Sequence, residues 1–197
     1  MTTPPQTAAG IVGREPLPVT GIPVLETERL RLRPFHAEDF EPLARLNADP
    51  DFMRYFGRAL RAGESWRQLA MFIGHWQLKG FGFWAVEDKA SGRFIGRIGC
   101  HEPAGWPGFE VGWGLDPAFW GQGLATEGGR AALAYAYDLV GAREVISVIH
   151  PDNAASIRVA EKLGARYERR MDLDGQPVLI YLHRDPRADP DRPWIAR

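Results

Sequence analysis

The sequence predicts a single α+β domain, in which about four helices flank a central, mostly antiparallel sheet of six to seven strands. Three apolar stretches joined by short turns, at 83–88, 93–102 and 109–115, predict consecutive strands. Links this short imply an antiparallel meander. Apolar residues at helical spacing in 63–79 and 124–139 predict helices before and after these strands. A chain of 197 residues is long enough for one domain with a sizeable core.

The first half of the chain begins with a polar leader, expected at residues 1–23, which is rich in Thr, Pro and Gly. The domain itself is expected at 24–185. Leucines alternate with arginines through 30–34, which predicts a half-buried strand. Helices follow at 37–46, where acidic residues occupy the first turn, and at 50–55.

The second half of the chain is expected to consist of short apolar elements separated by glycine-containing turns. These elements are a strand at 145–149, a helix at 153–163, and a hairpin of strands at 167–173 and 178–183. Charge and proline in residues 186–197 predict a loose tail.

Composition excludes several classes of protein. The net charge of −1 provides no general attraction for nucleic acid. No apolar run approaches the roughly 20 residues of a membrane span, and the first residues lack the pattern of a signal peptide. The single cysteine, Cys100, lies in an apolar run and is expected in the core, which fits a reducing cytoplasm. We therefore expect a cytoplasmic protein without nucleic-acid or membrane partners, as a monomer or a homodimer.

The stretch 110–136 carries the strongest functional signal. A buried strand ends at Asp116, a turn containing Gly121 and Gly123 follows, and a helix begins at Leu124. Glycine lets the backbone turn sharply and lets a ligand approach the main chain. The first amides of a helix have no partner within it and suit a phosphate or pyrophosphate. An ordinary strand–turn–helix corner would use the same glycines for geometry alone.

Known phosphate-binding loops fit this turn to different degrees. It lacks the Gly-Lys-Ser/Thr ending of a P-loop, and Thr126 replaces the third glycine of a dinucleotide fingerprint. The segment WGQGLA at 120–125 instead resembles the acetyl-CoA loop of the GNAT superfamily of N-acyltransferases, Arg/Gln-x-x-Gly-x-Gly/Ala, with Trp120 in place of Arg or Gln. The strings PAFWGQGLATEGGRAAL and LETERLRLRPFHAEDFEPLARL resemble the Rim-type branch, which contains ribosomal-protein amino-terminal acetyltransferases.

A second motif begins at Asn153, a good helix cap, with Ser156 at the third helical position. Capping alone would explain both residues. However, the string NAASIRVAEKLGA at 153–165 resembles the later GNAT motif, Asn-x-x-Ser/Ala followed by Lys-x-Gly-Phe, with Ala165 in place of Phe. Both motifs in this order are more specific than either alone, and the resemblance covers residues 25–184.

The GNAT resemblance implies acetyl-CoA or CoA as cosubstrate, with no metal. It also implies a sheet that splays between the strands at 110–115 and 145–149, where the pantetheine arm bonds an open edge. Gly112 and Gly114 fit this interpretation, because a strand glycine marks a bulge or a close approach, although a bulge without a ligand would also explain them. The residues expected to bind acetyl-CoA are Leu115, Gly121, Gln122, Gly123, Leu124, Ala125, Thr126, Asn153 and Ser156.

The implied reaction transfers an acetyl group to a primary amine by direct attack in a ternary complex. An ammonium must lose a proton before attack, and the leaving thiolate benefits from a hydrogen-bond donor. Many GNAT enzymes place a tyrosine acid where this chain has Ala160. By resemblance to Rim-type relatives, Ser156 is the expected donor to sulfur. Glu110 is the expected base, with His101 and Glu102 as rivals and a structural hydrogen bond as its alternative role.

The acceptor is expected to be a peptide amino terminus or a small-molecule amine. Four aromatic residues near the predicted early helices, Phe52, Tyr55, Phe56 and Trp76, include candidates for lining its pocket, although packing explains most such residues. Two alternative functions stay open. One is a catalytically silent module that binds or senses acyl-CoA, and the other is an acyltransferase that uses a different acyl-CoA.

Overall fold

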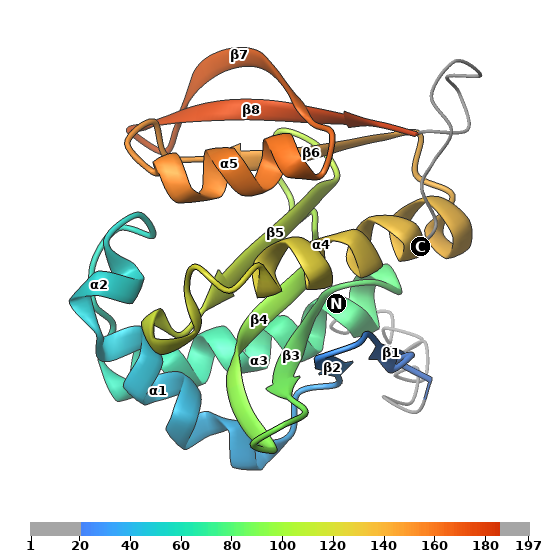
Figure 1. Cartoon of the computed structure of the whole chain (residues 1–197). Helices are drawn as coiled ribbons and strands as arrows, with labels where there is room; N and C mark the ends of the chain where they lie inside the picture. The colour runs from blue at the N-terminus through green and yellow to red at the C-terminus, as the bar shows by residue number, and fades with distance from the viewer. Residues whose placement is uncertain (1–20, 186–197) are drawn as a thin grey trace, which may run out of the picture.

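The computed structural model describes residues 21–185, which form an eight-stranded sheet in the order β1-β2-β3-β4-β5-β6-β8-β7 (Figure 1). Within these residues β5 and β6 are parallel and every other neighbouring pair is antiparallel. The strands are β1 Leu25–Glu26, β2 Leu30–Arg33, β3 Phe83–Asp88, β4 Arg93–His101, β5 Glu110–Leu115, β6 Glu144–Ile149, β7 Arg166–Leu173 and β8 Gln176–Arg184.

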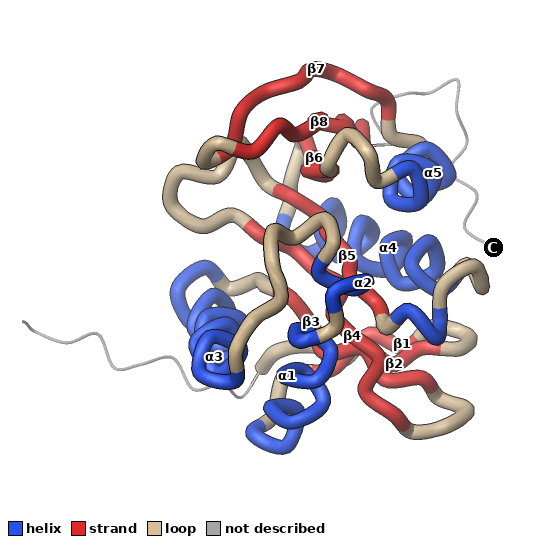
Figure 2. Tube along the Cα trace, turned by 90° about the vertical axis from the view of Figure 1, so that its left-hand side faces the viewer, coloured by secondary structure: helices blue, strands red, loops and turns tan. Residues whose placement is uncertain are grey.

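Helices cover both faces of the sheet. Figure 2 shows α1 and α3 to one side of β3, β4 and β5, and α4 to the other. The α-helices are α1 Phe40–Ala48, α2 Pro50–Met53, α3 Ala62–Lys79, α4 Leu124–Tyr135 and α5 Ala154–Lys162. This arrangement confirms the expected mixed fold with a mostly antiparallel sheet, and β3, β4 and β5 form the predicted meander.

Side chains of β4 and β5 alternate between the two faces of the sheet. Ile98, Cys100 and Val111 are fully buried in the main core, together with apolar residues of α4. Arg97 and Glu110 lie on the opposite face, where the Arg97 guanidinium packs over the Phe72 ring of α3. This alternation places two charged groups on one face of the sheet, away from the main core.

β5 and β6 lie side by side at one end only. Glu110 and Ile146 are the one pair of residues in register between them, and the Ile146 amide donates to the Phe109 carbonyl at 2.8 Å. Beyond that point the two strands diverge (Figure 1). The sheet therefore splays between β5 and β6, where the sequence placed the opening.

The structure differs from the expected elements in two places. The two-residue strand β1 pairs with β2 and brings the sheet to eight strands, and it is too short to show any periodicity. The helix expected through 139 is α-helical only to Tyr135 and continues as a π-helix over Ala136–Val140. Gly141 ends this segment in the left-handed conformation.

Residues 22 and 23, which precede the expected start of the domain at residue 24, contact the rest of the chain. Ile22 packs against the main core, and the Pro23 carbonyl accepts a hydrogen bond from the Trp84 indole at 2.7 Å. We therefore propose that residues 22 and 23 form part of the domain. Residues 1–20 and the predicted tail at 186–197 lie outside the described residues.

Cys100 lies fully buried in the main core, as predicted. Burial raises the pKa of its thiol far above the usual range, so the sulfur stays protonated. Between residues 21 and 185, no helix is both long and apolar enough to cross a bilayer. In the same range, no three His, Cys, Asp or Glu side chains are grouped so as to hold a metal ion.

Candidate active site

The glycine turn joins a short 3-10 helix after β5 to the start of α4. Gly121 and Gly123 adopt the left-handed conformation, with φ of 76° and 81°, which a side chain would disfavour. The amide of Glu127 donates to the Gly123 carbonyl at 3.0 Å. The preceding helical amides, from Leu124 to Thr126, are too early in α4 to find a helical acceptor, and they lie at the positive end of the helix dipole.

Arg29, just before β2, holds this turn in place. One terminal nitrogen donates to the Gln122 carbonyl at 2.9 Å, and the other pairs with the Glu127 carboxylate at 2.7 Å. The Thr27 hydroxyl also donates to Glu127, at 2.6 Å. Burial raises the pKa of Glu127, but the hydrogen bonds from Thr27 and Arg29 outweigh it and hold the pKa below its usual value. The charged brace is therefore present at neutral pH.

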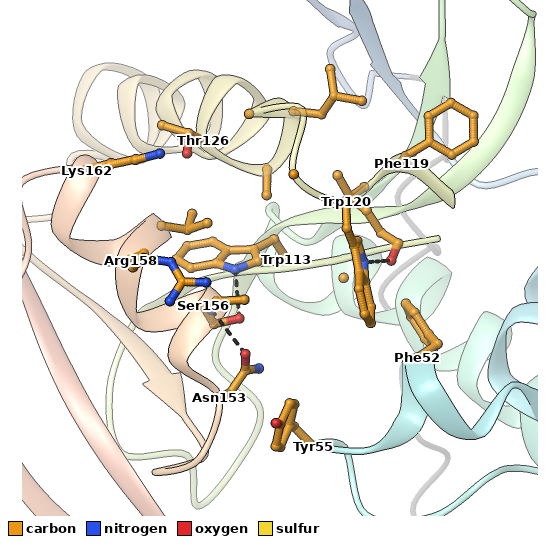
Figure 3. Close-up of a pocket in the computed structure, with 18 of the residues that line it drawn as sticks. Phe52, Tyr55, Trp113, Phe119, Trp120, Thr126, Asn153, Ser156, Arg158 and Lys162 are labelled. Atoms are coloured by element: carbon orange, nitrogen blue, oxygen red, sulfur yellow. Dashed lines mark hydrogen bonds between the residues drawn. The ribbon is translucent and has the colours of Figure 1, made fainter. Parts of the chain in front are cut away.

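The start of α5 positions Ser156. The Ser156 amide donates to the Asn153 side-chain oxygen at 3.0 Å, which is the predicted cap. The Trp113 indole N–H, from β5, donates to the Ser156 hydroxyl oxygen at 3.2 Å (Figure 3). Because that oxygen already accepts a hydrogen bond, the hydroxyl proton is oriented away from Trp113 and can be donated to a ligand.

A cavity of about 250 Å³, the loop cavity, lies between the glycine turn, α2 and α5. Figure 3 shows Trp113, Asn153 and Ser156 on one side of it and Phe52 and Trp120 on the other. The residues expected to bind acetyl-CoA that line this cavity are Leu115, Gly121, Gly123, Leu124, Ala125, Thr126, Asn153 and Ser156. Gln122 does not line it, and its side chain donates to the Ala118 carbonyl at 3.4 Å.

Two cations that sequence reasoning did not select, Arg158 and Lys162 of α5, also line the loop cavity. They are four residues apart and so share one face of the helix. Their four-residue spacing within the helix predicted after Asn153 was the one sequence feature that could have identified them. Together with the start of α4, these side chains favour an anionic ligand in this cavity.

The opening beside β5 exposes a backbone edge. Alternation along the strand directs the backbone groups of Trp113 and Leu115 toward the side from which β6 diverges. The Leu115 carbonyl accepts a hydrogen bond from the Trp120 indole at 2.6 Å. Trp120, which departs from the family pattern, is 52% exposed and covers the end of the strand. The backbone groups of Trp113 therefore remain available to hydrogen-bond an extended ligand.

A second cavity of about 420 Å³, the sheet cavity, lies against the face of β4 and β5 that carries Arg97 and Glu110. The two cavities share some of their lining residues and therefore meet beside Ser156. The shared residues are Tyr55, Phe56, Trp113, Asn153 and Ser156. A group held at this junction would be reachable from both cavities.

The aromatic candidates for the acceptor pocket separate clearly. Tyr55 and Phe56 line both cavities and Phe52 lines the loop cavity, whereas Trp76 lines neither. The Trp76 indole is buried and donates to the Phe83 carbonyl at 2.9 Å.

The close approach predicted at Gly114 is made by phenylalanine rings of the protein itself. A Cβ at that position would lie 3.2 Å from Phe52 and 3.3 Å from Phe56.

Glu110 stands where β5 and β6 begin to diverge, and only 7% of its surface is exposed. One carboxylate oxygen accepts the Trp106 indole N–H at 2.8 Å, and the other accepts the Val148 amide at 3.3 Å. Burial raises the pKa of Glu110 to about 7, against the lowering effect of these two hydrogen bonds and of Arg97. A carboxylate with this pKa can accept a proton at neutral pH.

The two rival bases have different surroundings. His101 lines the sheet cavity and stacks on His75 with ring centroids 5.3 Å apart. Burial, and then the charges of His75 and Arg97, lower the pKa of His101 to about 4, which makes it a weak proton acceptor. Glu102 lines neither cavity, and its carboxylate pairs with Lys79 at 3.3 Å.

Comparison with known proteins gives consistent similarities. The family described as Acetyltransferase (GNAT) domain matches residues 29–166. The uncharacterized protein YkkB of Bacillus subtilis (strain 168) is 33% identical over 80% of this chain and 93% of its own length. The uncharacterized N-acetyltransferase YoaA of the same organism is 30% identical over 74% of this chain and 84% of its own.

Solved structures show the same fold. An acetyltransferase from Agrobacterium tumefaciens str. C58 superposes with a TM-score of 0.77 at 29% identity, over 88% of this chain and all of its own. RimL, a ribosomal L7/L12 alpha-N-protein acetyltransferase solved with coenzyme A, superposes with a TM-score of 0.69 at 19% identity. That superposition covers 82% of this chain and 98% of RimL.

Proposed function

Because the chain belongs to the GNAT family of acetyltransferases, we propose that it transfers the acetyl group of acetyl-CoA to a primary amine by direct attack in a ternary complex. The observation that carries this proposal is the meeting of two cavities beside Ser156. One cavity has the features of an anion site, and the other holds a buried carboxylate with a pKa near 7.

The loop cavity supplies what CoA requires. The amides from Leu124 to Thr126 would bind the pyrophosphate, and Arg158 and Lys162 would add positive charge. The open edge at Trp113 would bind the pantetheine arm and lead the thioester toward Ser156.

The sheet cavity supplies the acceptor side. An ammonium beside Glu110 would lose one proton to the carboxylate, and the resulting neutral amine would attack the thioester carbonyl. The new C–N bond forms as the C–S bond breaks, and the electron pair of the C–S bond leaves on sulfur. The nitrogen loses its second proton to give the amide, and the thiolate takes up a proton and is released as CoA thiol. The Ser156 hydroxyl, oriented by Trp113, would donate its hydrogen bond to that sulfur. Positioning of the two substrates provides much of the remaining rate enhancement.

We assign the chain to the Rim-type branch within this proposal, on the basis of its two sequence strings and the serine at 156. The acceptor is then a peptide amino terminus or a small amine. A catalytically silent acyl-CoA sensor remains the competing function, because Trp120 and Ala160 both depart from common GNAT patterns.

A turnover assay separates these functions. Thiol release from acetyl-CoA is followed across a panel of small amines and peptides, with each acetylated product identified by mass. Release that depends on an acceptor supports the enzyme. Tight binding of acetyl-CoA without release, for every member of the panel, would replace the enzyme with the sensor. Propionyl-CoA and longer acyl-CoA arms test whether acetyl is the preferred group.

A further inference from the structure

Arg97 of β4 is a buried cation without a polar partner. Only 6% of its surface is exposed, and its Nη1 atom makes no hydrogen bond. Among residues 21–185, no carboxylate forms an ion pair with it, although Glu110 lies near enough to influence its charge. Burial of an unpaired charge is strongly unfavourable, so this arrangement calls for a reason.

Phenyl rings surround the guanidinium. Its central carbon lies 4.7 Å from the ring centroid of Phe56, 5.4 Å from Phe52, 5.5 Å from Phe72 and 6.0 Å from Phe83. Cation–π attraction offsets part of the lost hydration. Burial lowers the pKa of Arg97 to about 10, so the group still carries its charge at neutral pH. The rings stabilise the cation without using its N–H donors.

Arg97 and Glu110 line the same sheet cavity. The ionisable side chains around that cavity are Arg54, Tyr55, Arg97, His101, His150, Glu110 and Asp174. Glu110 is the proposed proton acceptor, which leaves Asp174 as the other carboxylate of the lining among the described residues. A polyamine acceptor would therefore meet a buried like charge at Arg97. An acceptor with an anionic group would meet a guanidinium whose Nη1 donor is unused.

We propose that Arg97 binds a carboxylate of the acceptor, so that the substrate is an amine that also carries a carboxylate. This inference rests on the proposed function, because it places the reacting amine at Glu110. A guanidinium binds a carboxylate through two parallel hydrogen bonds, which fixes the orientation of the acceptor as well as its charge.

The register of the sheet sets the spacing of the two backbone positions. Arg97 lies opposite Gly114, four residues along β5 from Glu110, which is roughly 13 Å of strand. Phe83 and a Glu110 oxygen both approach the position that a Cβ on Gly112 would take, at 3.3 Å and 3.1 Å. The middle of the acceptor would therefore lie against the Phe83 ring. Because the Glu110 oxygen reaches toward Gly112 and the Arg97 guanidinium lies 6.0 Å from the Phe83 ring centroid, the side chains set the distance between the two charged groups, and the test uses spacers of several lengths.

Matched pairs of acceptors test the proposal on the wild-type protein. Each pair is an amino carboxylate and the same amine with a carboxamide in place of the carboxylate. One arm uses α-amino acids and ω-amino carboxylates of increasing length, and another uses short peptides with Asp or Glu against Asn or Gln. We expect the carboxylate of at least one pair to be preferred on the order of 10²-fold in kcat/KM. Equal rates within every pair would overturn the proposal, and the arm that responds identifies the source of the carboxylate.

Variants connect the preference to one side chain. Arg97→Gln should reduce it to a few-fold, and Arg97→Lys should retain part of it because the charge remains without the fork. Arg45→Gln is the matched control, because Arg45 is exposed and lines neither cavity. A preference that survives in Arg97→Gln would show that another group binds the carboxylate.

A binding measurement separates failure of this inference from failure of the proposed function. Melting temperatures are measured with CoA and with each member of a matched pair, in wild-type protein and in Arg97→Gln. The amino carboxylate should stabilise CoA-bound wild-type protein more than its carboxamide does, and CoA itself should stabilise both proteins equally. If no amine is ever acetylated, this difference still supports the carboxylate site, and its absence refutes it.

Discussion

Replacement of Glu110 by glutamine should make the protein more stable and less active at the same time. The pKa of Glu110 is raised from 4.5 to about 7, because the folded protein buries the carboxylate. A group with a raised acid pKa contributes stability below pH 4.5 that is lost as the pH rises through 7. At pH 8 the ionised side chain therefore costs about 3 kcal/mol relative to a neutral one.

Glutamine removes the charge and keeps most of the shape. Its oxygen can still accept the Val148 amide, but its NH₂ group cannot accept the Trp106 indole, and loss of that hydrogen bond costs about 1 kcal/mol. The net gain at pH 8 is about 2 kcal/mol, or roughly 4–8 °C in melting temperature for a chain of this size. Near pH 5 the wild-type carboxyl is already protonated, so the gain should disappear.

Melting curves and pH–rate profiles of Glu110→Gln test both halves of this prediction. The wild-type kcat/KM should fall about tenfold per unit below pH 7, and the variant should lose roughly 10²–10⁴-fold in rate, with its profile shifted upward. Glu102→Gln, which changes a partly exposed carboxylate outside both cavities, is the control and should alter neither property. A variant that melts lower than wild type at pH 8, or that keeps the break near pH 7, would refute the reasoning.

Three other predictions follow from the site. Ser156→Ala should lower kcat on the order of 10²-fold with CoA affinity nearly unchanged. Asn153→Ala should weaken CoA binding and cost about 1 kcal/mol of stability. If Ser156→Ala keeps the wild-type kcat but melts at a lower temperature, Ser156 acts only in capping the helix. CoA at a hundredfold over its Kd should add ~2.7 kcal/mol to the free energy of unfolding, and NAD and ATP should add much less, which a thermal-shift screen measures; equal stabilisation by NAD would contradict the site. Removal of residues 1–20 should leave the melting temperature and CoA affinity unchanged. Removal of residues 1–23 also deletes the Pro23 carbonyl that accepts the Trp84 indole hydrogen bond, and it should lower the melting temperature. Identical melting temperatures of the two truncated proteins would show that Pro23 contributes nothing to stability.

The sequence predicted the fold well because its elements follow strong local patterns. Apolar runs and short turns predict the meander from 83 to 115, and Gly121 and Gly123 predict the glycine turn. The splay between β5 and β6 came from family resemblance, and no local pattern in either strand would have indicated it. The two-residue strand β1 forms because it pairs with β2, and a strand this short has no periodicity in its sequence.

The functional site was predictable only where one motif contained it. The residues of the glycine turn, and Asn153 with Ser156, each lie within one short motif. The loop cavity contains all of the residues expected to bind acetyl-CoA except Gln122. Arg97 and Trp106 gave no signal, because their surroundings are built from separate strands, loops and helices. Neither the burial of Arg97 nor its missing partner can be inferred from an arginine in a strand.

Single-turnover analysis by mass spectrometry tests direct acetyl transfer most directly. The protein is mixed with an equal amount of labelled acetyl-CoA, first alone and then with an accepted amine, and the label is located on CoA, protein and amine. Direct transfer predicts that the label stays on CoA until the amine is added and then moves to the amine nitrogen, with one CoA released for each amine acetylated. Acetylated protein that forms before the amine is added and then passes its label on would contradict transfer in a ternary complex.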